Sequence, residues 1–203
     1  MDTKELHVIS TGRQPFADLA AAMRDIHRFV SCFHLREKTK TAAELMAAIE
    51  LLQAAGMPAE RIVVNDRADV AAAAGASGVH LAYHSLSVSA VKRLFPQLRV
   101  GKSVHSEEEA VQAEAEGADY VMYGHIFPTS SKPGLPARGI EALRLLAARV
   151  RIPVVAIGGI KPPDAGAVLN AGAAGVAVMS GILEADDPGR AAAAYYDALY
   201  REV

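Results

Sequence analysis

The sequence has no tryptophan, a single cysteine and only 5% aromatic residues. The lone Cys32 cannot form a disulfide within the chain, so a reducing compartment is expected. Lys and Arg number 21 against 23 Asp and Glu, which gives a net charge of −2 and argues against nucleic-acid binding. No apolar run approaches the roughly 18 residues of a membrane span, and Met1–Thr11 predicts no signal peptide. We therefore expect a cytoplasmic globular protein.

Short apolar runs alternate with longer Ala- and Leu-rich stretches, which predicts strands followed by helices. Val154–Ile157 is wholly apolar, as in a parallel strand covered on both faces. Ala42–Leu52 and Ile140–Val150 have the period of amphipathic helices. The predicted strands are Leu6–Ser10, Phe33–Arg36, Ile62–Asn65, Val79–Leu81, Leu98–Ser103, Tyr120–Tyr123, Val154–Ile157 and Val176–Met179.

Eight strand–helix units at about 25 residues each predict a single-domain (β/α)8 TIM barrel spanning residues 1–203. A Gly-Ala signature at Gly75, Gly117 and Gly172 marks the expected ends of helices. Thr41 and Ser106 are candidate helix N-caps. The rival fold is a doubly wound sheet. It usually has a GxGxxG loop after its first strand, and this sequence has none there.

In such a barrel, the site forms where the carboxyl ends of the strands meet. Small residues around Gly159 and Met179–Gly181 follow the last two predicted strands, and they predict a phosphate seat built from backbone N–H groups. Simple tight turns are the alternative. Arg36 and Lys38 supply cations at the second strand end, although Arg36 could instead form a structural ion pair. Asp66 could hold Mg²⁺ or cap the next helix.

His125 follows the sixth predicted strand, beside apolar residues. An imidazole titrates near neutral pH, so it can move a proton between two carbon atoms. A buried structural role is the alternative reading. His84 and His105 lie near the mouth without obvious partners, and no spacing of His, Cys and Asp resembles a zinc site.

Seven short motifs in order resemble the thiamine phosphate synthase superfamily over essentially the full chain, and that resemblance also implies a (β/α)8 barrel. The motifs are Leu35–Lys38, Val64–Asp69, Gly78–Leu81, Gly117–Val121, Pro128–Lys132, Ala156–Ile160 and Val178–Ile182.

Within that superfamily, synthases join a pyrimidine pyrophosphate to a thiazole phosphate and need Mg²⁺, whereas TenI-like tautomerases aromatise a carboxythiazole phosphate without metal. Synthases generally carry Gln in place of His34, an acidic metal ligand in place of Ser85, and Gly-Pro in place of Gly124-His125. With Ser85 there, Asp66 is left as the one obvious Mg²⁺ carboxylate. Together, these departures favour the tautomerase.

The resemblance then implies that His125 moves the proton and that Gly159, Met179 and Ser180 seat the phosphate. Thr129 and Ser131 would line the thiazole, and Arg36, Lys38 or Lys132 would face the carboxylate. The full expected set of binding residues is Arg36, Lys38, Asn65, Ser103, Thr129, Ser131, Lys132, Gly159, Met179 and Ser180.

We expect no cofactor, no metal and a small thiazole phosphate substrate, with neither nucleic acid nor membrane as partner. A homodimer is expected only from the general frequency of such assemblies. The first alternative is a Mg²⁺-dependent thiamine phosphate synthase. The second is a non-catalytic ligand-binding or regulatory barrel.

Overall fold

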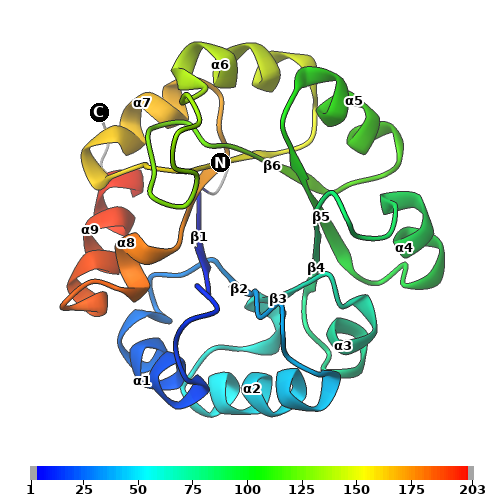
Figure 1. Cartoon of the computed structure of the whole chain (residues 1–203), viewed down its shortest axis with the longest axis vertical. Helices are drawn as coiled ribbons and strands as arrows, with labels where there is room; N and C mark the ends of the chain where they lie inside the picture. The colour runs from blue at the N-terminus through cyan, green and yellow to red at the C-terminus, as the bar shows by residue number, and fades with distance from the viewer. Residues whose placement is uncertain (1–3, 201–203) are drawn as a thin grey trace.

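A computed structural model describes residues 4–200, which form a closed barrel of eight parallel strands inside a ring of helices (Figure 1). The strands are hydrogen-bonded in chain order, and β1 also pairs with β8 to close the barrel. The predicted fold class is therefore confirmed. The strands are β1 (Glu5–Ile9), β2 (Cys32–Leu35), β3 (Ile62–Asn65), β4 (Gly78–Leu81), β5 (Arg99–Val104), β6 (Tyr120–Gly124), β7 (Val154–Ile157) and β8 (Gly175–Val178).

The helices follow the strands and cover the outside of the barrel (Figure 1). They are α1 (Phe16–Ile26), α2 (Ala42–Ala54), α3 (Ala68–Ala73), α4 (Val88–Leu94), α5 (Glu107–Ala115), α6 (Gly139–Arg149), α7 (Ala165–Asn170), α8 (Ser180–Leu183) and α9 (Pro188–Tyr200). Two short 3-10 turns, η1 (Ala59–Arg61) and η2 (Pro162–Asp164), precede β3 and α7. Within residues 4–200, no helix is both long and apolar enough to cross a membrane.

The strand side chains alternate between two separate cores, because successive residues of a strand point to opposite faces. Residues such as Leu6, Val8 and Phe33 belong to the large core beneath the helices. A smaller apolar cluster lies inside the barrel, and its buried members are Ile9, Tyr120, Met122, Val155 and Ala177. This double coverage explains why the strands are apolar along nearly their whole length.

The predicted helix boundaries rest on local chemistry that the structure confirms. Thr41 caps α2 in a capping box with Glu44, and Ser106 caps α5 by accepting from the backbone N–H of Glu109. Gly75, Gly117 and Gly172 have φ values of 63°, 93° and 95°, the left-handed conformation expected after a helix.

The strand predictions agree closely with the structure. Ile62–Asn65 and Val154–Ile157 match β3 and β7, and each of the other strands is shifted or extended by one residue at one or both ends. Of the two roles considered for Asp66, helix capping is not found. The N-cap of α3 is Arg67, without a side-chain hydrogen bond.

Candidate active site

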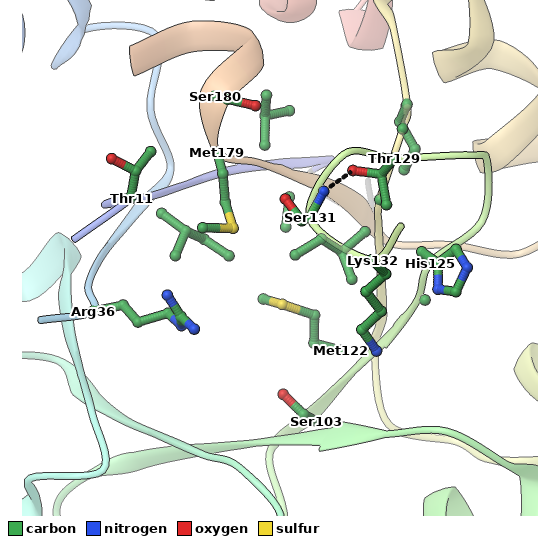
Figure 2. A pocket seen from close by; sticks show the side chains of 18 of the residues that line it. Thr11, Arg36, Ser103, Met122, His125, Thr129, Ser131, Lys132, Met179 and Ser180 are labelled. Atoms are coloured by element: carbon green, nitrogen blue, oxygen red, sulfur yellow. Dashed lines mark hydrogen bonds between the residues drawn. The ribbon is translucent and has the colours of Figure 1, made fainter. Parts of the chain in front are cut away.

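A cavity of about 750 Å³ opens at the carboxyl ends of the strands. It brings together all of the site residues predicted from the sequence, and Figure 2 shows most of them around one opening. The residues are Arg36, Lys38, Asn65, Ser103, His125, Thr129, Ser131, Lys132, Gly159, Met179 and Ser180. The structure establishes this common location, and the role of each residue stays a prediction.

Small residues after β7 and β8 form one wall of the cavity. Gly159 has a φ of 68°, and a Cβ there would collide with the carbonyl oxygen of Pro128. Only glycine therefore lets the loop after β7 approach the loop after β6 so closely. Ser180 and Gly181 begin α8 and also line the cavity. The first amides of a helix have no partners within it, so this wall can bind an anion.

Cationic side chains reach the cavity from two opposite sides. Figure 2 shows Arg36 entering from β2 and Lys132 from the loop after β6. The Nζ of Lys132 lies 3.5 Å from Nε2 of His105, whose other ring nitrogen lies 3.4 Å from a Glu109 oxygen. Within residues 4–200, no carboxylate lies within ion-pair distance of Arg36 or Lys132. The structural ion pair considered for Arg36 is thus not formed there, and both cations can meet an anionic ligand.

The floor of the cavity has polar atoms above an apolar layer. Ser103 and Met122 lie at this level (Figure 2). Nε2 of His80 lies 2.8 Å from Oγ of Ser103. Oδ1 of Asn65 and Oγ1 of Thr11 are buried there without a hydrogen-bond partner in the described part of the chain. Buried polar atoms normally have partners, so these two are candidates for binding a ligand.

A cluster of polar side chains fills the barrel directly below the floor. His7, His34 and His80 are all buried, and Nδ1 of His7 lies 2.8 Å from Nε2 of His34. Nε2 of His7 lies 2.8 Å from Glu5, whose carboxylate also accepts two hydrogen bonds from Arg99, each 3.1 Å long. The barrel interior is therefore more polar than the apolar runs indicated.

Burial controls the ionisation of this cluster. It lowers the pKa of all three histidines, that of His80 to about 3, and the neighbouring histidines lower the pKa of His34 further. Burial raises the pKa of Glu5, but hydrogen bonds from His7 and Arg99 outweigh it and bring that pKa down to about 2. The histidines are thus neutral and the carboxylate is ionised at neutral pH.

Asp66 lies at the end of β3, on the rim of the cavity. Its Oδ2 lies 3.1 Å from Nε2 of His84, and its Oδ1 accepts a hydrogen bond from the hydroxyl of Ser85. Neither contact was predicted from the sequence, because it is the pairing of β3 with β4 that brings Asp66 to the loop after β4. The partners of His84 and His105 correct the expectation that these histidines stand alone.

His125 is almost fully buried at the edge of the cavity. Its Nε2 lies 3.2 Å from the carbonyl oxygen of Leu135, and its backbone carbonyl accepts from the N–H of Arg138. Both contacts join the end of β6 to the loop that carries Lys132. In Figure 2, Lys132 extends farther into the opening than His125 does.

Comparisons with known proteins agree on one family. The chain matches the family described as thiamine monophosphate synthase over residues 6–182. It is 45% identical to a thiamine-phosphate synthase of Chlorobium luteolum, over 78% of this chain and 76% of that protein. It is 43% identical to a thiamine-phosphate synthase of Anaeromyxobacter dehalogenans, over 93% and 84%.

Solved structures give a consistent result. A thiamine phosphate pyrophosphorylase from Pyrococcus furiosus superposes with a TM-score of 0.82 at 31% identity, covering 98% of this chain and 96% of that one. A 3-hexulose-6-phosphate synthase, with a TM-score of 0.71 at 21% identity, shares the fold alone.

These relatives overturn the expectation of a thiazole tautomerase. Proteins 43–45% identical to this chain are named as synthases, which are transferases, so the assignment as a TenI-like isomerase is wrong. The role of His125 as a proton carrier depended on that reaction and is withdrawn with it. The departures at His34, Ser85 and His125 therefore need another explanation.

Proposed function

This chain belongs to the thiamine monophosphate synthase family, and from that premise we propose that it is a thiamine-phosphate synthase. The proposed reaction joins a pyrimidine carried as its pyrophosphate to a thiazole phosphate and releases pyrophosphate. The observation that carries the proposal is the 43% identity to a relative of that name over 93% of this chain. The cavity offers two sets of anion-binding groups, the backbone amides after β7 and β8 and the cationic side chains, as two phosphorylated substrates require.

Each set of anion-binding groups is assigned one substrate. The thiazole phosphate binds the amides around Gly159 and Ser180, where the hydroxyl of Ser180 adds a donor. The pyrophosphate binds the cations Arg36, Lys38 and Lys132, which line the same cavity. This arrangement would hold the thiazole nitrogen close to the carbon that it attacks, and such positioning is itself a large part of catalysis.

The same cations would assist departure of the pyrophosphate. Negative charge grows on this group as its bond to the pyrimidine carbon breaks, and donors that are already in place stabilise that charge. Thr129 and Ser131 line the cavity on the same loop as Lys132, where they would contact the thiazole. The nucleophile in this reaction is the substrate's own nitrogen, so no histidine is needed as a base.

The family implies Mg²⁺, and the donor set at the rim fits a hard cation. Asp66 supplies a carboxylate and Ser85 a hydroxyl, and Mg²⁺ bound to phosphates commonly needs only one or two carboxylates from the protein. When bound, the cation would neutralise part of the charge on the pyrophosphate. Asp66 is the residue that would hold it, and the sequence expectation of no metal is not carried into this proposal.

A mixing experiment tests the proposed function. Purified protein, pyrimidine pyrophosphate, thiazole phosphate and Mg²⁺ should yield thiamine phosphate and pyrophosphate in equal amounts. Arg36→Ala should lower kcat/KM on the order of 10²-fold, whereas Arg93→Ala, at an exposed site on α4, should not. Absence of thiamine phosphate with either Mg²⁺ or Mn²⁺ would refute the proposal.

We also propose a cytoplasmic location, because the only cysteine is a buried free thiol whose pKa burial raises to about 12. Such a thiol is unreactive and suits a reducing compartment. A homodimer stays a prediction, which light scattering on the purified protein would measure.

A further inference from the structure

Lys132 is placed differently from the rest of its loop. The residues on either side of it, 130–131 and 133–138, are all exposed, whereas Lys132 is half-buried. A lysine side chain rotates about four bonds and loses conformational entropy when it is held in one position. The position of the ammonium group therefore depends on what it contacts.

The ammonium group of Lys132 contacts the imidazole of His105. Its Nζ lies 3.5 Å from Nε2 of the ring, a long hydrogen bond that joins the loop after β6 to the end of β5. Within residues 4–200, this is the only hydrogen bond that Nζ makes. Of the described residues, His105 is thus the one whose side chain directs this cation.

His105 is itself held by the first turn of α5. Its backbone N–H donates to Oε2 of Glu109 at 2.7 Å, and the same oxygen lies 3.4 Å from Nδ1 of the ring. The next residue, Ser106, caps the helix by accepting from the N–H of Glu109 at 3.2 Å. The imidazole therefore projects from a hydrogen-bonded junction between β5 and α5, and it offers Lys132 a fixed partner.

The charge state of His105 suits it to accept from an ammonium group. Burial of the ring lowers the pKa of His105, and the positive charges of Lys132 and Arg138 lower it further. Glu109 acts in the opposite direction but does not cancel them. The ring is thus neutral at pH 7.5, and with its proton on Nδ1, beside Glu109, its Nε2 can accept.

A bond to His105 leaves Lys132 able to bind an anion. An ammonium group has three N–H donors, so two remain when one of them points at Nε2 of the ring. Lys132 lines the cavity, and Figure 2 shows its side chain extending into the opening. The contact with His105 therefore fixes the direction of the remaining donors.

We propose that His105 is a positioning residue, which orients the ammonium group of Lys132 for binding pyrophosphate. The inference deepens the proposed function, because it takes pyrophosphate as the anion that Lys132 binds. When the ammonium group is already oriented, less side-chain entropy is lost as the anion binds, so the affinity is higher than with a freely rotating lysine. His105 acts through Lys132 and does not need to touch the substrate.

Titration calorimetry with inorganic pyrophosphate and Mg²⁺ tests this role. His105→Leu removes the acceptor and should weaken pyrophosphate binding about three- to tenfold. His105→Gln places an amide oxygen near the position of Nε2, so its affinity should stay within about twofold of wild type. His27→Leu makes the same change at a histidine that bonds to backbone carbonyls of α1, and it should have no effect. The His105 side chain is 38% exposed, so neither substitution there should unfold the protein.

A double-mutant cycle separates positioning from a general structural effect. Lys132→Met should weaken pyrophosphate binding about tenfold or more. Adding His105→Leu to that variant should cause no further loss, because the effect of His105 requires the ammonium group. A loss of the same size with and without the Lys132 ammonium group would overturn the proposal. Wild-type affinity in His105→Leu, or no pyrophosphate binding by the wild-type protein, would also overturn it.

Synthesis assays on the same proteins distinguish this inference from the proposed function. Formation of thiamine phosphate together with unchanged pyrophosphate affinity in His105→Leu would refute the positioning role and leave the function standing. The expected pattern of affinities without any synthesis would refute the function and support the positioning role.

Discussion

The three buried histidines should make the protein unusually sensitive to mild acid. Burial lowers the pKa of His7, His34 and His80 in the folded state, whereas an unfolded chain has histidine pKa values near 6.5. Below pH 6.5 the unfolded state therefore binds protons that the folded state excludes. Stability must fall as the pH falls, from about 6.5 down to the folded pKa values, which for His80 is about 3.

The size of the effect follows from the number of protons. Each histidine that stays neutral contributes a slope of about 1.4 kcal/mol per pH unit once the pH is well below 6.5. For His80, whose folded pKa is about 3, the loss between pH 7.5 and 5.0 should be about 2 kcal/mol, and His7 and His34 add to this loss in the same direction. Such a loss is large against the 5–15 kcal/mol typical of a domain. Glu5, whose folded pKa is about 2, adds a further loss only below pH 4.5.

Urea denaturation followed by circular dichroism at several pH values measures this slope. His80→Gln should reduce this pH-dependent loss by about 2 kcal/mol between pH 7.5 and 5.0, whatever its effect on stability at pH 7.5. A free energy of unfolding that stays constant from pH 7.5 to 5.0 would show that the buried histidines take up protons as readily as those of the unfolded chain, which would refute the reasoning.

Three further outcomes are expected. Gly101→Ala should cost about 1–3 kcal/mol of stability in urea denaturation, because its Cβ would overlap the ring of Tyr120 inside the barrel; an unchanged midpoint would contradict that packing. Ser180→Ala should raise KM for thiazole phosphate and leave kcat nearly unchanged, and an unchanged KM would exclude its hydroxyl from the phosphate seat. Thr41→Ala should cost about 1 kcal/mol, seen as a lower Tm, since it removes the hydroxyl that accepts from the backbone N–H of Glu44, although the backbone N–H of residue 41 can still donate to the Glu44 carboxylate; Thr41→Ser should retain most of this stability.

The barrel could be predicted from the sequence because its determinants are local. Apolar runs, the left-handed glycines at Gly75, Gly117 and Gly172, and the cap at Thr41 each act within a few residues. The positions of the site residues followed from the fold, because every strand of a parallel barrel ends at the same mouth. No contact between distant segments was needed for either inference.

What escaped prediction depends on contacts across the barrel. His7 and His34 lie on neighbouring strands, and only the barrel register brings their rings together. The pairing of Asp66 with His84 likewise requires β3 and β4 to be adjacent. The reaction was mispredicted for a related reason. A few substitutions at the mouth were given more weight than the rest of the chain, although single side chains there can change while the substrates stay the same.

The ion pair between Glu5 and Arg99 has a consequence at the opposite end of the barrel. An ionised Glu5 can only accept, so Nε2 of His7 must carry its proton and Nδ1 must be bare. That bare nitrogen accepts from Nε2–H of His34, which leaves Nδ1 of a neutral His34 as an acceptor beside the side-chain amide of Asn65. The Glu5 carboxylate therefore fixes the tautomers of both His7 and His34. As a result, Nδ1 of His34, which lies below the cavity, can accept a hydrogen bond but cannot donate one.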